Sequence, residues 1–92
     1  MKIFNSNRYK KVSYGTLEKV LLKLKYERVE SETKYRVYVN DSYDAVIALP
    51  NYTDDVILDD RHYNGVVTNI IGMGVLPNID KFENLIDKMD NL

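Results

Sequence analysis

The sequence predicts an α+β domain in which helices cover one face of a three-stranded antiparallel sheet, in two layers and in the order α-β-β-β-α-α. Residues 35–50 alternate side chains with a period of two on either side of a polar turn, which is typical of a half-buried β-hairpin. Apolar residues before and after this hairpin recur every three or four positions, as in amphipathic helices. A length of 92 residues suits one domain, here residues 1–92.

The N-terminal part is expected to form a leader, a helix and a short strand. Residues 1–12 lack periodicity and are interpreted as the leader, with a short extended piece at residues 2–4. Ser13 is a suitable N-cap for the helix that follows. Residues 27–31 add a strand with Val29 directed inward. The inward stripe of the helix is expected to consist of Tyr14, Leu17, Val20, Leu21 and Leu24.

The hairpin is expected to have one buried and one open face. Pro50 ends its second strand because proline cannot donate a hydrogen bond to the sheet. The buried face is expected to carry the aliphatic residues Val37, Val39, Ile47 and Leu49. The other face is expected to be open to solvent or to a partner, and to include Arg36, Tyr38 and Ala48.

An acidic loop and two helices complete the prediction. Residues 51–60 form the loop, and Asp59 or Asp60 caps the next helix. The apolar stripe of that helix is expected to consist of Tyr63, Val66, Val67, Ile70 and Ile71. The last helix spans residues 79–92 with Asp80 as its cap, and its inward residues are expected to be Phe82, Leu85, Ile86 and Met89.

Charge is distributed unevenly along the chain. Residues 1–36 hold ten Lys and Arg against four Glu, whereas the remaining residues hold three basic and ten acidic side chains. This asymmetry suggests a polyanion or an acidic partner on one face, although a solvated helix surface with scattered lysines is the favoured explanation, since charged helix faces are common. The absence of cysteine excludes disulfides and thiolate metal sites. Because no stretch is apolar enough for a signal peptide or a membrane span, we expect a cytoplasmic protein.

One residue outside the hairpin is a candidate for catalysis. His62 is the single imidazole in the chain, so it could act as a general base. A role as a capping or surface residue at a helix N-terminus is the alternative. The neighbouring carboxylates lack the spacing of a calcium loop, so neither a metal nor another cofactor is expected.

Three stretches of the sequence are also informative when they are read together. They are LEKVLLKLKYERV, YRVYVNDSYDAVIALPNY and RHYNGVVTNIIGMGVLPNIDKF. In this order they resemble the first helix and strand, the proline-ended hairpin, and the second helix with its glycine stop in the HicA-type toxin family of bacterial toxin–antitoxin systems. The resemblance covers about residues 13–82 and implies a fold similar to a double-stranded RNA-binding domain. It also implies an activity, which is endoribonucleolytic cleavage of mRNA.

The sequence departs from this family at the catalytic motif. The family's Gly-Ser-His motif is replaced by Thr33, Lys34 and Tyr35, so Tyr35 stands at the histidine position. The resemblance therefore implies an RNA-binding domain without the usual histidine-based cleavage. Aromatic rings interleaved with cations could stack on unpaired bases and hold phosphates. The expected RNA contacts are Lys19, Lys23, Lys34, Arg36 and Tyr38.

Two alternatives stay open at this point. The chain could be a non-catalytic interaction module that uses the open face or the edge of its sheet. It could also be an active mRNA endonuclease with a rearranged site, for which His62 is the alternative base. The corresponding partners are RNA, an antitoxin-like protein, or a second copy of the chain as a homodimer.

Overall fold

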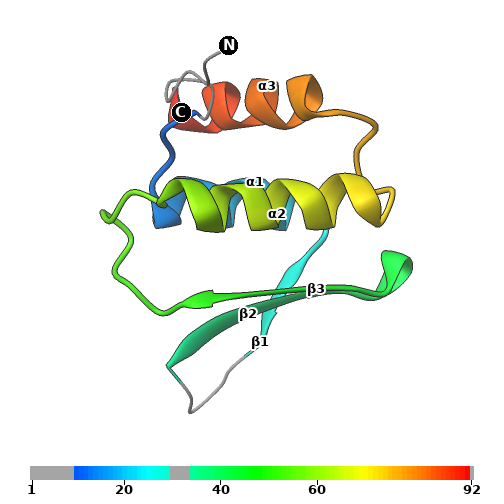
Figure 1. Cartoon of the computed structure of the whole chain (residues 1–92), viewed down its shortest axis with the longest axis horizontal. Helices are drawn as coiled ribbons and strands as arrows, with labels where there is room; N and C mark the ends of the chain where they lie inside the picture. The colour runs from blue at the N-terminus through cyan, green and yellow to red at the C-terminus, as the bar shows by residue number, and fades with distance from the viewer. Residues whose placement is uncertain (1–9, 30–33, 92) are drawn as a thin grey trace, which may run out of the picture.

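The fold consists of an antiparallel sheet, two helices that cover one of its faces, and a third helix on the far side of those two (Figure 1). The computed structural model describes residues 10–29 and 34–91. The predicted class and element order are confirmed. The elements are α1 (Tyr14–Lys23), β1 (Glu27–Val29), β2 (Tyr35–Asn40), the 3-10 helix η2 (Asp41–Tyr43), β3 (Ala45–Pro50), α2 (Asp60–Gly72) and α3 (Ile79–Asp90).

Each α-helix begins at a polar side chain that accepts a hydrogen bond from a free backbone amide. Ser13 accepts from the amide of Thr16, as its predicted role as a cap requires, and Asp59 accepts from the amide of His62. The predicted cap of α3 was wrong, because Asn78 caps this helix. Asp80 lies instead in the first turn, where its negative charge interacts favourably with the helix dipole.

The helices form the core mainly with their predicted stripes. The buried helical residues are Tyr14, Leu17, Val20 and Leu21 in α1, Tyr63, Val66 and Ile70 in α2, and Phe82, Ile86 and Met89 in α3. The helix α3 packs against α1 and α2 and therefore forms a third layer beyond them, where two layers were expected (Figure 1). The reason is that α1 and α2 offer apolar surface on both sides, to the sheet and to α3.

The sheet has the strand order β1-β2-β3, and all of its pairs are antiparallel. In β3 the buried residues are Ala45, Ile47 and Leu49, which confirms the predicted inner face of that strand. The predicted faces of β2 were inverted. The inward residues of β2 are Arg36, Tyr38 and Asn40, whereas Val37 and Val39 lie half-buried on the outer face.

The short strand β1 follows the same pairing. Val29 pairs with Val37 and is 44% exposed, so its predicted inward position was wrong. Arg28 pairs with Tyr38, which places it with the inner face. Ala48 is exposed on the outer face, as predicted.

The chain before α1 is tied to the loop that precedes α2. Val12 is buried, and its carbonyl accepts a hydrogen bond of 2.9 Å from the amide of Leu58. The predicted extended piece at residues 2–4 lies outside the described residues. No helix in the described part of the chain is long and apolar enough to cross a membrane.

Candidate functional site

A depression of about 500 Å³ lies at the open end of the hairpin, away from its turn, and is lined by Lys34, Tyr35, Pro50, Asn51 and Tyr52. Tyr35 is 54% exposed and Tyr52 is 51% exposed. This volume lies within the range of roughly 300–1,000 Å³ that is usual for ligand pockets. Two aromatic rings, one cation and one amide therefore surround a hollow that is large enough for a small ligand. We call it the hairpin pocket.

The backbone after β3 brings the lining residues together. The amide of Asn51 donates to the carbonyl of Lys34 at 2.8 Å, so the strand pairing continues one residue past Pro50. The amide of Tyr52 then donates to the carbonyl of Pro50 at 3.0 Å, which turns the chain. A loop residue is thereby placed beside the beginning of β2.

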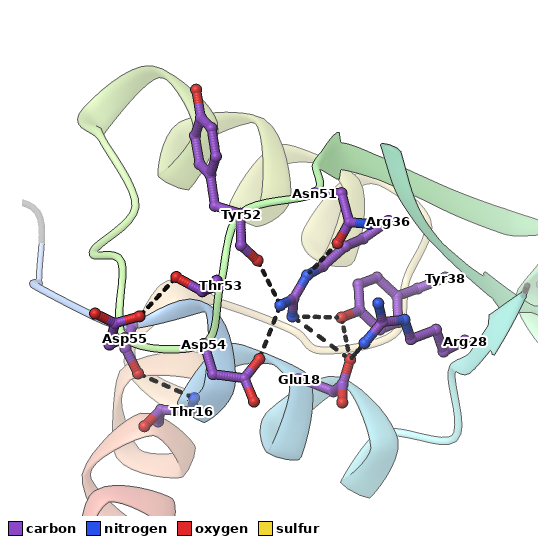
Figure 2. Close-up of polar contacts among 11 residues, drawn as sticks. Thr16, Glu18, Arg28, Arg36, Tyr38, Asn51, Tyr52, Thr53, Asp54 and Asp55 are labelled. Atoms are coloured by element: carbon purple, nitrogen blue, oxygen red, sulfur yellow. Dashed lines mark hydrogen bonds and ion pairs between the residues drawn. The ribbon is translucent and has the colours of Figure 1, made fainter. Parts of the chain in front are cut away.

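The guanidinium of Arg36 holds this loop from the protein interior (Figure 2). Its Nη2 donates to the carbonyl oxygen of Tyr52 at 2.6 Å and to Oδ1 of Asp54 at 2.8 Å, and its Nε donates to Oδ1 of Asn51 at 3.3 Å. Arg36 is only 4% exposed, so water cannot replace these contacts. The planar donor group consequently fixes the backbone that carries two pocket residues.

Glu18 of α1 neutralises the other side of the same guanidinium (Figure 2). Its Oε1 lies 3.6 Å from Nη1 of Arg36 and 2.9 Å from Nη1 of Arg28, and it also accepts a hydrogen bond from the hydroxyl of Tyr38. Burial, together with this bond to Glu18, raises the pKa of Tyr38 to about 12. Although burial opposes the charged form of Arg36, hydrogen bonds to Asp54 and Tyr38 raise its pKa above the usual value. Arg36 therefore stays charged and Tyr38 stays neutral at physiological pH.

Tyr14 of α1 connects this buried network to the pocket. The guanidinium of Arg36 lies over its ring, 5.3 Å from the centroid. The same ring meets Tyr52 edge to face, with 5.6 Å between the centroids and 80° between the planes. Arg36 thus bonds the carbonyl of Tyr52 and Tyr14 packs against its ring, while about half of the surface of Tyr52 stays exposed.

Three of the five predicted RNA contacts are on the surface. Lys34 lines the hairpin pocket, and Lys19 and Lys23 are exposed on α1. The expected open position of Arg36 and Tyr38 was wrong, because both are buried and bonded inside the protein. Their side chains are therefore not available to a ligand on the surface.

Asn51 and Tyr52 were not singled out by the sequence reasoning. The available signal was an aromatic residue, Tyr52, that stands in a polar loop two positions after the proline that ends the strand. The hydrogen bonds that bring this loop beside β2 join residues 15–18 positions apart, so the pattern of nearby residues could not reveal them.

His62 lies apart from the hairpin pocket. It lines a separate groove of about 200 Å³ between β3 and α2, and the two hollows share no lining residue. Its Nδ1 is 3.2 Å from Oδ1 of Asp59, and its backbone amide donates to the same oxygen. The hydrogen bond of that amide lowers the pKa of Asp59. No group of three or more potential metal ligands occurs in residues 10–29 and 34–91.

The outer face of the sheet is mostly apolar and exposed. Val29, Tyr35 and Val46 are 44%, 54% and 55% exposed. The pairing of the strands places them on one surface with Val37, Val39 and Ala48, and with the exposed Glu27 opposite Val39. We call this surface the outer face. Tyr35 belongs both to it and to the hairpin pocket.

The hairpin pocket offers groups that are suited to binding. Among the described residues, its lining contains an ammonium group, two phenols and an amide. Exposed aromatic rings offer stacking surface for planar groups, and a lysine offers a positive charge for phosphate. Comparison of the chain with family models, with curated proteins and with solved structures gave no significant match.

Proposed function

We propose that the chain is a HicA-like RNA-binding domain of toxin–antitoxin type that holds single-stranded RNA in the hairpin pocket without cutting it by the family's histidine mechanism. The observation that carries this proposal is the composition of the pocket. It lies where the resemblance places the family's catalytic motif, and it offers Tyr35, Tyr52 and Lys34 in place of an imidazole.

Stacking on exposed tyrosines supplies the affinity for bases. Such contacts are worth about 1–3 kcal/mol per base and tolerate different base identities. The amide of Asn51 can add a hydrogen bond to a base edge, because its Oδ1 already accepts from Arg36 and its amide nitrogen has donors to spare. We therefore expect a preference for unpaired over paired RNA.

Lysines at the pocket and on α1 add attraction that does not depend on sequence. Lys19 and Lys23 are exposed on α1, and Lys34 is exposed at the pocket. Within residues 10–29 and 34–91, no carboxylate lies within ion-pair distance of any of these three ammonium groups. Their charge can therefore be neutralised by phosphates.

An abasic strand provides a direct test. A single-stranded RNA and a sugar–phosphate strand of equal length and charge should be compared by filter binding at about 50 mM salt, where electrostatic association is favoured. The proposal predicts markedly tighter binding of the strand that carries bases. Equal affinities would leave only charge attraction, and no binding of either strand would remove RNA as the ligand.

The absence of histidine-based cleavage is tested on the same RNA. We expect the purified protein to leave mRNA intact, because no imidazole lines the pocket. Robust cleavage that is lost in His62→Ala would instead make the groove at α2 a rearranged active site.

The outer face supports a second candidate function, which is binding of a protein partner. Exposed, contiguous apolar surface on a small domain is a common mark of an interaction site. The resemblance makes an antitoxin-like protein the natural partner, and a second copy of the chain is the alternative. Because Tyr35 belongs to both sites, a partner on the outer face would also compete with RNA for the hairpin pocket.

Charge placed on the outer face tests this candidate. Val29→Lys should reduce self-association in sedimentation and also binding of a hydrophobic dye, because Val29 lies on the outer face and is 44% exposed. Thr68→Lys is the control, since Thr68 is exposed on α2, away from this surface. If Val29→Lys and Thr68→Lys behave alike, the outer face is not an interaction surface.

A further inference from the structure

The groove between β3 and α2 lies along an edge of the sheet formed by the described residues. Within residues 10–29 and 34–91, the order β1-β2-β3 gives β3 one neighbouring strand, and residues 46–49 of β3 form one wall of the groove. Arg61, His62, Gly65 and Asn69 of α2 contribute to the other wall. The groove therefore combines a strand edge with a helix side.

The hydrogen-bond pattern shows which backbone groups of β3 face this groove. In an antiparallel pair, residues alternate between those that bond the neighbouring strand and those that point away from it. The bond from Asn51 to Lys34 puts these two in the bonded class, so Val46, Ala48 and Pro50 point away from β2. The side chain of Asn69 agrees with this assignment, because its Nδ2 donates to the carbonyl of Val46 at 2.9 Å. The amide and carbonyl of Ala48 consequently face the groove.

The middle of this edge is little protected against strand addition. Exposed edges are commonly protected by charged side chains, proline, bulges or a covering element. Pro50 ends the strand and Asn69 of α2 bonds the carbonyl of Val46, but residues 47–49 between them contain no charged residue. On the facing helix, Gly65 has no heavy atom within 4 Å of the position where a Cβ would stand. The groove is thus left open beside Ala48.

The charges around the groove indicate what could occupy it. Arg61 and His62 line it, and none of the lining residues in the described part of the chain carries a carboxylate. Asp59 contacts Nδ1 of His62 but does not line the groove. Nε2 of His62 is therefore left for other contacts. An extended segment with a carboxylate near its middle would pair this charge with Arg61 and direct apolar side chains onto the strand edge.

We propose that an extended, acidic segment of a partner protein adds to β3 as a fourth strand, bonded to the amide and carbonyl of Ala48, with a carboxylate on Arg61. Addition of a strand to a sheet edge gains affinity from backbone hydrogen bonds and specificity from alternate side chains. The site goes beyond the RNA function, because it shares no residue with the hairpin pocket.

Selection from a displayed library of random peptides of about ten residues, the upper length of ordinary strands, tests the proposal on the full chain. The expected result is enrichment of peptides that alternate apolar residues and carry Asp or Glu. On addition of a selected synthetic peptide, amide exchange measured by NMR should slow at Ala48. No enrichment, or enrichment of basic peptides, would overturn the proposal.

Three variants and one control variant then locate the bound peptide. Ala48→Pro removes only a backbone amide that points away from β2, and strands tolerate proline at such a position. The variant should therefore bind the peptide about tenfold or more weakly. Gly65→Leu should fill the groove, whereas Gly72→Leu, with equally free space but outside the groove, should bind normally. Arg61→Gln should remove the preference for acidic peptides. Unchanged peptide binding in Ala48→Pro and Gly65→Leu would refute the site. Slow amide exchange at Ala48 in a dimer without peptide would also overturn the proposal, because a second copy of the chain would then occupy the edge.

Discussion

The guanidinium of Arg36, buried under the sheet, donates a hydrogen bond of 2.6 Å to the backbone carbonyl of Tyr52 in the loop after β3. This bond joins the inner face of β2 to the wall of the hairpin pocket. Because Arg36 also bonds Asn51 and Asp54, one interior side chain sets the path of the loop. The pocket is therefore a product of the buried network and not of the loop alone.

Removal of this side chain should weaken both the fold and the pocket. Arg36→Ala leaves the carbonyl of Tyr52 and Oδ1 of Asn51 without their donor and removes one of the three partners of Glu18, and we expect a loss of roughly 2–3 kcal/mol in the free energy of unfolding. The loss should be smaller than for a fully enclosed pair, because Asp54 is exposed. Urea unfolding measures it. The control is Lys23→Ala, on the exposed face of α1, which should change the free energy of unfolding by less than about 0.5 kcal/mol. Equal losses in the two variants would contradict the role of Arg36.

The inverted faces of β2 lead to a second prediction. Ile70→Ala should cost roughly 2–5 kcal/mol, because Ile70 is completely buried in α2. Val37→Ala should cost less than about 1 kcal/mol, because Val37 is only half-buried on the outer face. Thermal or urea unfolding compares them. A large loss for Val37→Ala would restore the sequence-based assignment of this residue to the core.

Stability should fall at alkaline pH. Burial raises the pKa of Tyr26 and of Tyr38 from 10.0 to about 12. Since the folded protein favours their neutral forms, this contribution is complete below pH 10 and is lost as the pH rises toward 12. Unfolding free energies measured across this window should decrease with pH. Tyr26→Phe should make the decrease shallower, and an unchanged pH dependence in this variant would show that Tyr26 ionises freely.

The exposed lysines should determine the salt dependence of RNA binding. Each phosphate contact contributes roughly 0.7 log unit of affinity per log unit of salt on single strands, so Lys19→Gln with Lys23→Gln should reduce the slope by about 1.4. Lys81→Gln with Lys88→Gln on α3 is the matched control. Equal slopes for the two double variants would mean that α1 does not contact RNA.

The hairpin shows how far the sequence could predict this structure. In β3 the buried residues are all apolar, so their alternation identified the inner face correctly. In β2 both sets of alternating residues contain large side chains, and the aliphatic set was assigned to the core. The structure buries Arg36, Tyr38 and Asn40 instead, because each finds a polar partner from a distant element.

Those partners explain the failure in physical terms. Asn40 donates to the carbonyl of Leu24, and Arg36 reaches Glu18 and Asp54, all at least 16 positions away in the sequence. A buried polar group is tolerated only when it is bonded, and bonding at this range depends on the tertiary fold. The same limitation concealed Tyr52, whereas Lys34 and Tyr35 could be identified because the resemblance pointed to their position.

The most direct test of the proposed RNA function compares two exposed tyrosines at opposite ends of the same hairpin. Tyr52 lines the pocket, and Tyr43, which is 43% exposed, lies in the turn. The affinity for a short unpaired RNA should be measured by filter binding for Tyr52→Ala and for Tyr43→Ala. Because stacking on a ring contributes about 1–3 kcal/mol per base, Tyr52→Ala should bind at least about fivefold more weakly with an unchanged salt slope, while Tyr43→Ala binds like the wild type. Equal affinities for the two variants would contradict binding of bases in the hairpin pocket.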